Sequence, residues 1–354
     1  MKKILFFLLL IPFLGFSQYT AIPDKIFEAA LIEFGFDDVI DGKVLSVNIS
    51  SVDSLDVSYK EISDLKGIEN FTALTFLDCI GNKLTSLAVS KNKDLTDLWC
   101  FRNQLTSLDV SNNRALIKLS CSHNRLKSLE LGKNKALEDL DCRNNQLTSL
   151  YLRKNKALSH LDCIRNQLTS LDVSKNRALI KLSCSHNRLK SLEFGKHKAL
   201  SWLNCHSNQI TNLDVIRCIA LKEILCNNNQ ITNLDLRNNK ALWTLNCSGN
   251  KLKSLKVSQN EALYELVCIN NQLSNLDVSK NKDLTDLACS LNQLTSLDVS
   301  KNRALFQLIC SHNRLTSLDV SQNTALTKLC CAFNKFDCKA LNSKFNIKSG
   351  YFCN

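Results

Sequence analysis

A repeated unit of 21 residues dominates this 354-residue sequence. It recurs without a gap from Leu74 to Ala325 in the frame L-x-x-L-x-C-x-x-N-x-L-x-x-L-x-V-x-x-N-x-A, whose positions we number 1 to 21. Position 6 is cysteine and position 9 is asparagine in thirteen successive units, the first cysteine being Cys79 and the last Cys331. One unit of this length cannot bury its own apolar face. The fixed period therefore predicts coils that stack into a solenoid with a shared core.

The first half of the unit, L-x-x-L-x-C-x-x-N-x-L, resembles the leucine-rich repeat signature, with Cys where Leu is commoner. The second half, for example L-T-S-L-D-V-S-K-N, repeats the same pattern. The whole unit is similar to the nested 21-residue (IRREKO-type) repeats of secreted bacterial leucine-rich repeat proteins, with internalins as more distant relatives. The resemblance implies a mostly β leucine-rich repeat solenoid of right-handed, parallel-stacked coils with a parallel sheet on its concave side. It also implies a binding scaffold and leaves the ligand open.

The two ends of the chain depart from the repeat. Residues 1–17 predict a secretory signal peptide, because Lys2 and Lys3 precede an apolar run and small residues at the expected cleavage site. This places the protein outside the cell or on its surface. The apolar run is too short to span a bilayer comfortably and no second run follows, so we expect no membrane span. The solenoid is expected over residues 52–336, and residues 337–354 form an irregular C-terminal cap with a short helix over 339–345.

Residues 18–51 are expected to cap the first layer of the core. Asp24 predicts the start of a short amphipathic helix and Gly35 predicts its end. Its apolar face is expected to comprise Ile26, Phe27, Ala30, Leu31 and Phe34. The alternation from Val44 to Val57 predicts short strands after the helix.

Thirteen of the seventeen cysteines fall at position 6, which points inward from its strand. Adjacent parallel strands hold such residues about 4.8 Å apart with parallel side-chain vectors, a geometry that disfavours disulfides between successive coils. We therefore expect a core ladder of free thiols that pack as small apolar groups. Cys338 and Cys353 lie off the ladder and are candidates for a disulfide with each other. Neither C-x-x-C spacing nor convergent histidines point to a metal, so no metal or cofactor is expected.

Two columns of asparagine, at positions 9 and 19, are expected to satisfy backbone groups in the turns. His197 and Cys218 interrupt the second column, which predicts irregular structure there. The absence of proline from 74 to 325 allows backbone ladders on both faces. Acids at position 15 lie near bases at positions 18 and 20 and predict a solvated salt lattice on the convex side. A longer period of three units is also visible, since residues 116–136 return almost letter for letter at 179–199.

The outward positions 3, 5, 7 and 8 are expected to form the concave face, because strand residues alternate in and out. The candidate ligand-binding residues on this face are Trp99, Phe101, Arg102, Asp141, Arg143, His160, Asp162, Arg165, Trp202 and His206. An apolar strip of Leu225, Val267, Ile269 and Ile309 follows them. Trp and Arg dominate interface energetics, and apolar groups in a row on a concave face imply a partner. The sequence thus predicts recognition of a protein or a glycan.

Other functions have less support in the residues. A structural protein of the cell surface without a specific ligand is the main alternative, although varied concave residues favour binding. Asp141 and Asp162 have a spacing of about 5 Å that suits a retaining glycosidase, yet Arg143 and Arg165 lie beside them and an open arc offers no enclosed pocket. We therefore assign no catalytic residue. The net charge of +12 comes from lysines that alternate with acids and have few nearby aromatics, so no nucleic-acid partner is expected. The sequence does not predict the oligomeric state.

Overall fold

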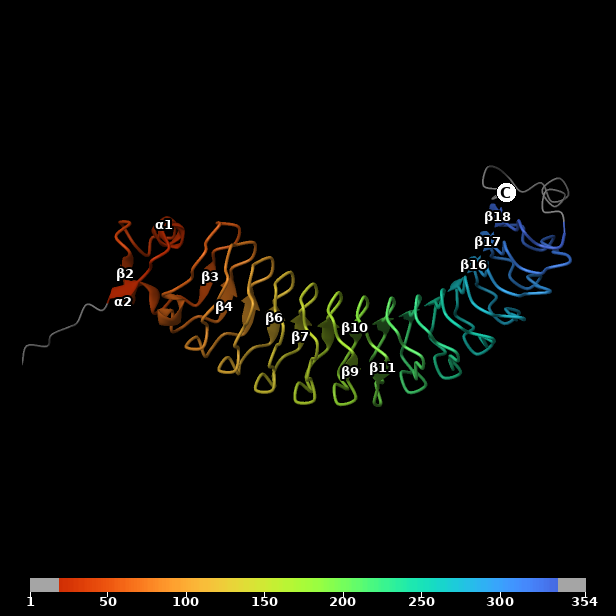
Figure 1. The fold of residues 1–354 in the computed structure, drawn as a ribbon, viewed down its shortest axis with the longest axis horizontal. Coiled ribbons are helices and arrows are strands. Elements are labelled where there is room, and N and C mark those ends of the chain that lie inside the picture. Colours follow the sequence, from red (N-terminus) through yellow and green to blue (C-terminus); the bar gives the residue numbers. More distant parts are fainter. Residues whose placement is uncertain (1–18, 337–354) are drawn as a thin grey trace, which may run out of the picture.

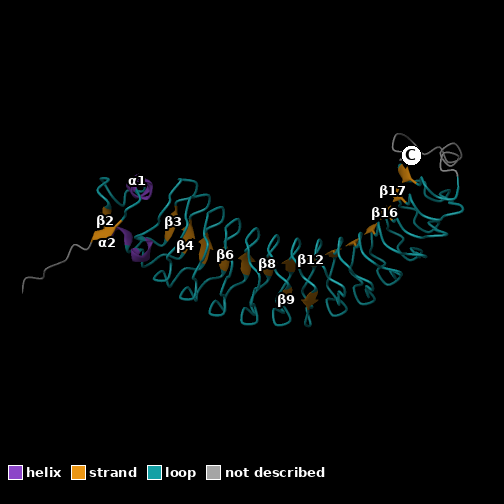
Figure 2. Cartoon of the chain, in the orientation of Figure 1, coloured by secondary structure: helices purple, strands orange, loops and turns teal. Residues whose placement is uncertain are grey.

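The computed structural model describes residues 19–336, which form a curved stack of coils (Figure 1). Each coil contributes one three-residue strand to a parallel sheet of fourteen strands. At the C-terminal end these strands lie along the inner edge of the arc (Figure 1). Most of each coil is loop or turn (Figure 2). The leucine-rich repeat solenoid predicted from the sequence is therefore confirmed.

The strands of the large sheet run in the order of the sequence, with two labels missing because those strands belong elsewhere. They are β3 (Ser54–Asp56), β4 (Phe76–Asp78), β5 (Asp97–Trp99), β6 (Lys118–Ser120), β7 (Asp139–Asp141), β8 (His160–Asp162), β10 (Lys181–Ser183), β12 (Trp202–Asn204), β13 (Glu223–Leu225), β14 (Thr244–Asn246), β15 (Glu265–Val267), β16 (Asp286–Ala288), β17 (Gln307–Ile309) and β18 (Lys328–Cys330). Each strand pairs in register with its neighbours, so that Trp99 lies opposite Ser120 and Asp141 opposite Asp162. Residues at one repeat position therefore form a column along the arc.

The core is built from six of these columns. Leucine or isoleucine at positions 1, 4, 11 and 14, cysteine at position 6 and mostly valine or leucine at position 16 are buried in nearly every coil. The ladder cysteines from Cys79 to Cys310 are free thiols and fully buried. Each of them raises the local packing density without the bulk of a leucine, which lets adjacent coils close onto one another.

The last strand departs from the expected ladder. Cys330 at the end of β18 and Cys331 just after it both take part in disulfide bonds, so the expectation of a free thiol at Cys331 is wrong. The geometric argument against cross-links applies only between parallel strands in register, and β18 has such a neighbour on one side alone. The expected pairing of Cys338 with Cys353, the helix over 339–345 and the signal peptide over 1–17 all lie outside the described residues.

The asparagine at position 9 satisfies backbone groups of two coils at once. Asn124 donates through Nδ2 to the carbonyls of Cys100 (3.0 Å) and Cys121 (3.1 Å), and its Oδ1 accepts from the backbone N–H of Leu105 (2.9 Å). The same pattern repeats along the array. The amide thus uses both its donor and its acceptor capacity in a place that water does not reach, as expected.

The asparagine at position 19 uses its donor group but not its acceptor group. Asn113 donates through Nδ2 to the carbonyls of Val89 (2.8 Å) and Asn92 (2.7 Å), but its buried Oδ1 has no hydrogen-bond partner. Nine further asparagines of this column leave Oδ1 unpaired in the same way. The two columns are therefore not equivalent, although the sequence treats them alike.

The N-terminal residues cap the stack largely as predicted. Helix α1 (Lys25–Glu33) begins at Asp24, whose carboxylate accepts from the backbone N–H groups of Ile26 and Phe27. The inner side of α1 buries Phe27, Ala30 and Leu31. Ile26 and Phe34 are exposed instead, so their assignment to the apolar face is wrong. They flank the buried stripe, and the cap is too small to cover both.

Residues 43–56 contain more than the strands expected there. Strand β2 (Lys43–Leu45) pairs antiparallel with β1 (Tyr19–Ala21), and the short helix α2 (Ser46–Ile49) precedes β3. The first, atypical coil also holds a single 3-10 turn, η1 (Ile68–Asn70). No helix within residues 19–336 has the length and apolar character needed to cross a bilayer.

The convex side carries less regular structure than predicted. Within the described chain, only β9 (Ser170–Asp172) and β11 (Ser191–Glu193) pair there, below β10 in Figure 1. Continuous backbone ladders on both faces are therefore not formed. The regular turn is lost at the buried His197, as expected, but it persists at Cys218. A buried cysteine fits this turn because Asn239 can still donate to the backbone carbonyl of Cys218.

The predicted salt lattice on the convex side is sparse. Asp109, Asp277 and Asp298 at position 15 each accept a hydrogen bond from the backbone N–H of the serine two residues later, and these bonds lower the pKa of each carboxyl. Within residues 19–336 this column makes two direct ion pairs, Arg153 with Asp172 and Arg237 with Asp235. The acids at position 15 therefore act mainly by accepting hydrogen bonds in the turns, and ion pairs are a smaller part of their interactions.

Candidate ligand-binding site

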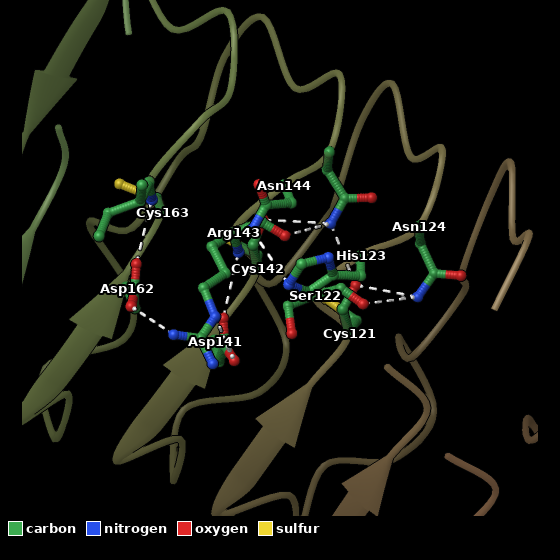
Figure 3. A network of polar contacts seen from close by, with 12 residues as sticks. Cys121, Ser122, His123, Asn124, Asp141, Cys142, Arg143, Asn144, Asp162 and Cys163 are labelled. Carbon is green, nitrogen blue, oxygen red and sulfur yellow. Dashed lines mark hydrogen bonds and ion pairs between the residues drawn. The ribbon is translucent and has the colours of Figure 1, made fainter. Parts of the chain in front are cut away.

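The concave face is formed by outward side chains at positions 3, 5, 7 and 8. In β5 the pattern is typical: Leu98 at position 4 is buried, while Asp97 and Trp99 on either side of it are partly exposed. Positions 7 and 8 lie just beyond the end of each strand. In Figure 3 the strand arrows point toward the loops that carry His123 and Asn144 at position 8. Four columns of side chains thus face the hollow of the arc or its upper rim.

Position 8 has a left-handed backbone in every regular coil. Its φ angle is between 52° and 57° at each non-glycine residue, which include Arg102, Arg165 and Leu291. Glycine, asparagine and aspartate tolerate this region best, whereas other side chains pay about 1–2 kcal/mol for it. Only Gly81 and Gly249 avoid this cost entirely. Large side chains at position 8 are therefore held in a strained but fixed direction.

The first candidate cluster surrounds Trp99. Its ring lies edge-on to Phe76 of the preceding coil, with ring centroids 5.1 Å apart. Trp99 and Phe101 are both half-buried, and Arg102 beyond them is exposed. Trp99 and Trp202 both lie at outward positions, yet neighbouring side chains leave each of them half-buried.

The second cluster is an acid–arginine network in the middle of the array (Figure 3). Arg143 reaches Asp141 through Nε (3.3 Å) and Asp162 through a terminal nitrogen (3.6 Å), so one cation bridges the two carboxylates. Burial raises the pKa of the Asp162 carboxyl, and the charge of Asp141 adds to this rise. The arrangement holds both signs of charge in fixed positions. Arg165 is exposed and makes no ion pair within residues 19–336, so it does not join the two acids as expected.

The third cluster lies around β8, β10 and β12. Ser159 hydrogen-bonds through Oγ with the Nδ1 of His160 (2.9 Å), which fixes the ring of this half-buried side chain. His206 packs edge-on against His186, with ring centroids 4.7 Å apart, and burial lowers the pKa of His206. Trp202 opens the same strand that precedes His206.

These clusters form a band along the arc. The strands from β5, which holds Trp99, to β12, which holds Trp202, are five steps apart, or about 24 Å. The structure therefore brings together Asp141, Arg143 and Asp162 but not the two tryptophans. Within the described chain no group of three or more His, Cys, Asp or Glu side chains is placed to hold a metal ion.

A further hollow of about 300 Å³ lies near the C-terminal end of the concave side. Leu291 and Phe333 are exposed beside it, and the ring of His312 stacks on Phe333 with centroids 4.3 Å apart. Ile309, from the apolar strip expected by sequence, also lines it. The hollow is mostly apolar and open to solvent.

Several solved structures have a similar architecture. The functional domain of InlJ from Listeria monocytogenes, which includes a cysteine ladder, is 34% identical in sequence with a TM-score of 0.77, and the match covers 90% of this chain and 76% of that one. The chain belongs to the internalin-type leucine-rich repeat family. An internalin, InlF of Listeria monocytogenes, shares the fold at 22% identity and a TM-score of 0.74, with 94% and 96% covered. The leucine-rich repeat protein LIC12759 of Leptospira interrogans does so at 23% identity and a TM-score of 0.74, with 85% and 89% covered. No protein-family model and no curated protein sequence matches the chain.

Some residues of the apolar hollow were not predicted from the repeat pattern. Leu291, His312 and Phe333 of the apolar hollow were not among the candidates, although they lie at position 8 of the expected concave face. The left-handed backbone that distinguishes this position is seen only in the structure.

Proposed function

We propose that this internalin-type chain is an exported binding protein that holds a protein ligand on its concave face. The proposed site runs from Trp99 to His206 and includes Phe101, Arg102, Asp141, Arg143, His160, Asp162, Arg165 and Trp202. The observation that carries the proposal is the fixed Asp141–Arg143–Asp162 network lying between two half-buried tryptophans in the same face. Aromatic anchors with oriented charges between them are the pattern found at energetic centres of protein interfaces.

Stacked repeats suit this role because they create long concave surfaces that a partner can follow. A solved structure with the same fold, the LRIM1/APL1C complex, has a TM-score of 0.68 and 21% identity. The buried columns here are nearly constant from coil to coil, whereas the outward positions 3, 5, 7 and 8 vary. A passive spacer has no physical need for that variation, so the pattern favours a binding role over a purely structural one.

Export is supported by two independent features. Residues 1–17 have the composition of a secretory signal peptide. In addition, Cys330 and Cys331 are disulfide-bonded, and structural disulfides persist in oxidising compartments outside the cytosol. The proposed segments are a signal peptide over 1–17, an N-terminal cap over 18–51, the solenoid over 52–336 and a C-terminal cap over 337–354.

Glycoside hydrolysis has little support in the geometry of the acid pair. A retaining mechanism needs one carboxylate free to attack and one carboxylic acid free to protonate the leaving group. Arg143 forms ion pairs with both Asp141 and Asp162, so neither carboxyl group is free for these two roles. The pair also lies on an open arc, where water is not excluded. A binding role for the two acids is therefore preferred.

The proposal is tested by binding measurements on the chain without residues 1–17. A panel of purified extracellular proteins and neutral glycans would first identify the ligand. Trp99→Ala and Trp202→Ala should then each weaken binding by about 2 kcal/mol, or roughly 30-fold, because a half-buried aromatic anchor loses its contact area. Melting temperatures measured in parallel would separate this loss from destabilisation.

A matched control uses charges on the opposite side of the coils. Lys133→Gln and Lys154→Gln should leave binding of the same ligand unchanged, since both side chains are exposed on the convex side. If both tryptophan variants bound normally and the lysine variants lost binding, the ligand site would lie on the convex side and not on the concave face. Binding of a glycan but of no protein in the panel would replace the protein ligand by a glycan.

A further inference from the structure

A second surface of the coils carries a charge distribution unlike that of the rest of the chain. It consists of positions 8, 10 and 12 in the twelve coils between Leu74 and Ala325, and we call it the basic flank. Positions 9 and 11 between them are buried, so the three outward positions alternate with the core. No Asp or Glu occurs at positions 8 to 13 in any of these coils. The basic residues of the flank are Lys83, Arg102, Arg125, Lys127, Arg165, Arg188, Lys190, Lys251, Lys253 and Arg314.

These ten cations contribute ten positive charges to a molecule whose formal net charge is +12, and no acid on the flank offsets them. All ten side chains are exposed. Within residues 19–336 one of them, Lys83, makes an ion pair, with Glu61 of the preceding coil (3.2 Å), and the other nine make none. The convex lysines differ, because they lie near the acids of position 15; Lys133, for example, lowers the pKa of Asp109. The flank thus differs from the convex side in that its basic side chains have no acidic side chain among them.

The cations of the flank are arranged along a line. Side chains of successive coils touch there: Lys251 donates to the side-chain oxygen of Gln230 (3.3 Å), and Asn144 contacts the ring of His123 (3.2 Å, Figure 3). The three-unit period of the sequence places basic doublets at Arg125 and Lys127, and again at Arg188 and Lys190. Three strand spacings separate successive doublets, or about 14 Å. A row of cations with this spacing can contact an extended polymer at several points, whereas it cannot surround a small anion.

The uncharged residues of the flank narrow the class of polymer. They are mainly Gln at position 10 and Thr or Ser at position 12, whose amide and hydroxyl groups both donate and accept hydrogen bonds. A chain rich in hydroxyl groups as well as negative charges matches them. Single-stranded nucleic acid would call for large aromatic side chains on which bases stack, and positions 8, 10 and 12 carry no Phe, Tyr or Trp between Leu74 and Ala325.

We infer that the basic flank binds a linear acidic polysaccharide, through its sulfate or carboxylate groups, independently of the ligand on the concave face. The flank and the concave face meet at position 8 but point their other columns in different directions. Both ligands could therefore occupy one molecule. The flank recognises charge density along a line, so its affinity should fall steeply as salt rises.

The test uses two polysaccharide probes, heparin for sulfate and polygalacturonate for carboxylate, with neutral dextran as the uncharged comparison. The intact chain without residues 1–17 should bind at least one acidic probe at low ionic strength and should not bind dextran. The variant Arg125→Gln/Lys127→Gln/Arg188→Gln/Lys190→Gln should bind at least about tenfold more weakly and with a shallower salt dependence, because four ionic contacts are lost. The relative affinities of heparin and polygalacturonate identify the anionic group.

The control variant Lys133→Gln/Lys135→Gln/Lys154→Gln/Lys156→Gln removes the same number of exposed charges from the convex side. It should change the affinity less than about twofold. Circular dichroism and melting curves should be the same for both variants, because none of the eight side chains is buried. Trp99→Ala should leave polysaccharide binding unchanged, which separates this surface from the concave site.

Three results would overturn the inference. Binding to neither acidic probe would remove the ligand class. Equal losses in the flank and convex variants would show that net charge alone is responsible. Tighter binding to oligo(dT) or to phosphatidylglycerol vesicles than to both polysaccharides would assign the flank to a nucleic acid or a lipid surface instead.

Discussion

At the scale of single residues, the adjacent positions 8 and 9 of each coil differ in how many residue types they accept. Position 9 requires one residue type, since only asparagine can give two donor bonds and one acceptor bond there, as Asn124 does. Position 8 accepts arginine, histidine, leucine and glycine alike, although its backbone favours glycine or asparagine. The hydrogen bonds of position 9 and the backbone pairing of position 8 hold the loop in place. The coil can therefore present a varied side chain at a strained position without losing its shape.

This strain predicts the effect of replacing Leu291, whose φ is 57° and whose side chain is exposed. Leu291→Asn should raise the free energy of unfolding by about 0.5–1 kcal/mol, because asparagine occupies the left-handed region at lower cost. Asn144, Asn228 and Asn270 already occupy this position in other coils. Urea denaturation of the two proteins measures the difference. Leu291→Ala is the control, since it removes the same apolar surface but keeps the strained backbone and should not stabilise.

At the scale of elements, the pattern of the sequence was sufficient wherever a structure depends on the repeat itself. The period, the inward columns and the buried thiols follow from which residues recur, and Asp24 marks the start of α1. What depends on contacts between coils was not predictable in this way. The covering of Trp99 by Phe76, the single convex pair β9–β11 and the bridging of two acids by Arg143 each require the placement of side chains from neighbouring coils.

The cysteine ladder predicts an unusual sensitivity to alkali. Burial raises the pKa of the thiols of Cys205, Cys247 and Cys310 to about 12, and it raises the pKa of the other ladder thiols in the same direction. In the unfolded chain these thiols ionise near pH 9, whereas in the folded chain they stay protonated. Stability is therefore complete below about pH 9 and is lost as the pH rises toward 12.

The size of this loss is large because many thiols act together. Each one costs about 1.4 kcal/mol per pH unit above its unfolded pKa, and the described chain has thirteen free buried cysteines. One pH unit thus removes an amount comparable with the whole stability of a domain. Far-ultraviolet circular dichroism in the presence of reductant should show unfolding between about pH 9 and 10.5. The variant Cys121→Ala/Cys184→Ala/Cys247→Ala should show a weaker pH dependence, and an unchanged one would contradict this account.

At the scale of the whole molecule, the arc consists of coils that each interact mainly with the two adjacent coils. Each coil contacts the coils before and after it, and the curved sheet continues from β3 to β18 with neighbouring strands parallel. Stability in such an array comes from each coil and from each interface between adjacent coils. The length of the array can therefore change in steps of whole coils. This separates the stability of the fold from the spacing of the residues on its concave face.

The three-unit period allows that separation to be tested with one deletion. Removal of residues 116–178 joins Ala115 to Leu179, and the coil that then follows is nearly identical to the one removed from that place. The shortened chain should fold, with the circular dichroism of the full chain and an arc shorter by about 14 Å in small-angle scattering. It keeps Trp99 and Trp202 but brings their strands from five steps apart to two, and it loses the Asp141–Arg143–Asp162 network. A ligand that spans both tryptophans should then bind at least about 100-fold more weakly, since neither anchor spacing nor charge is retained. If the shortened arc folded and bound that ligand normally, one tryptophan cluster alone would form the site; if it failed to fold, the coils would be less independent than their contacts indicate.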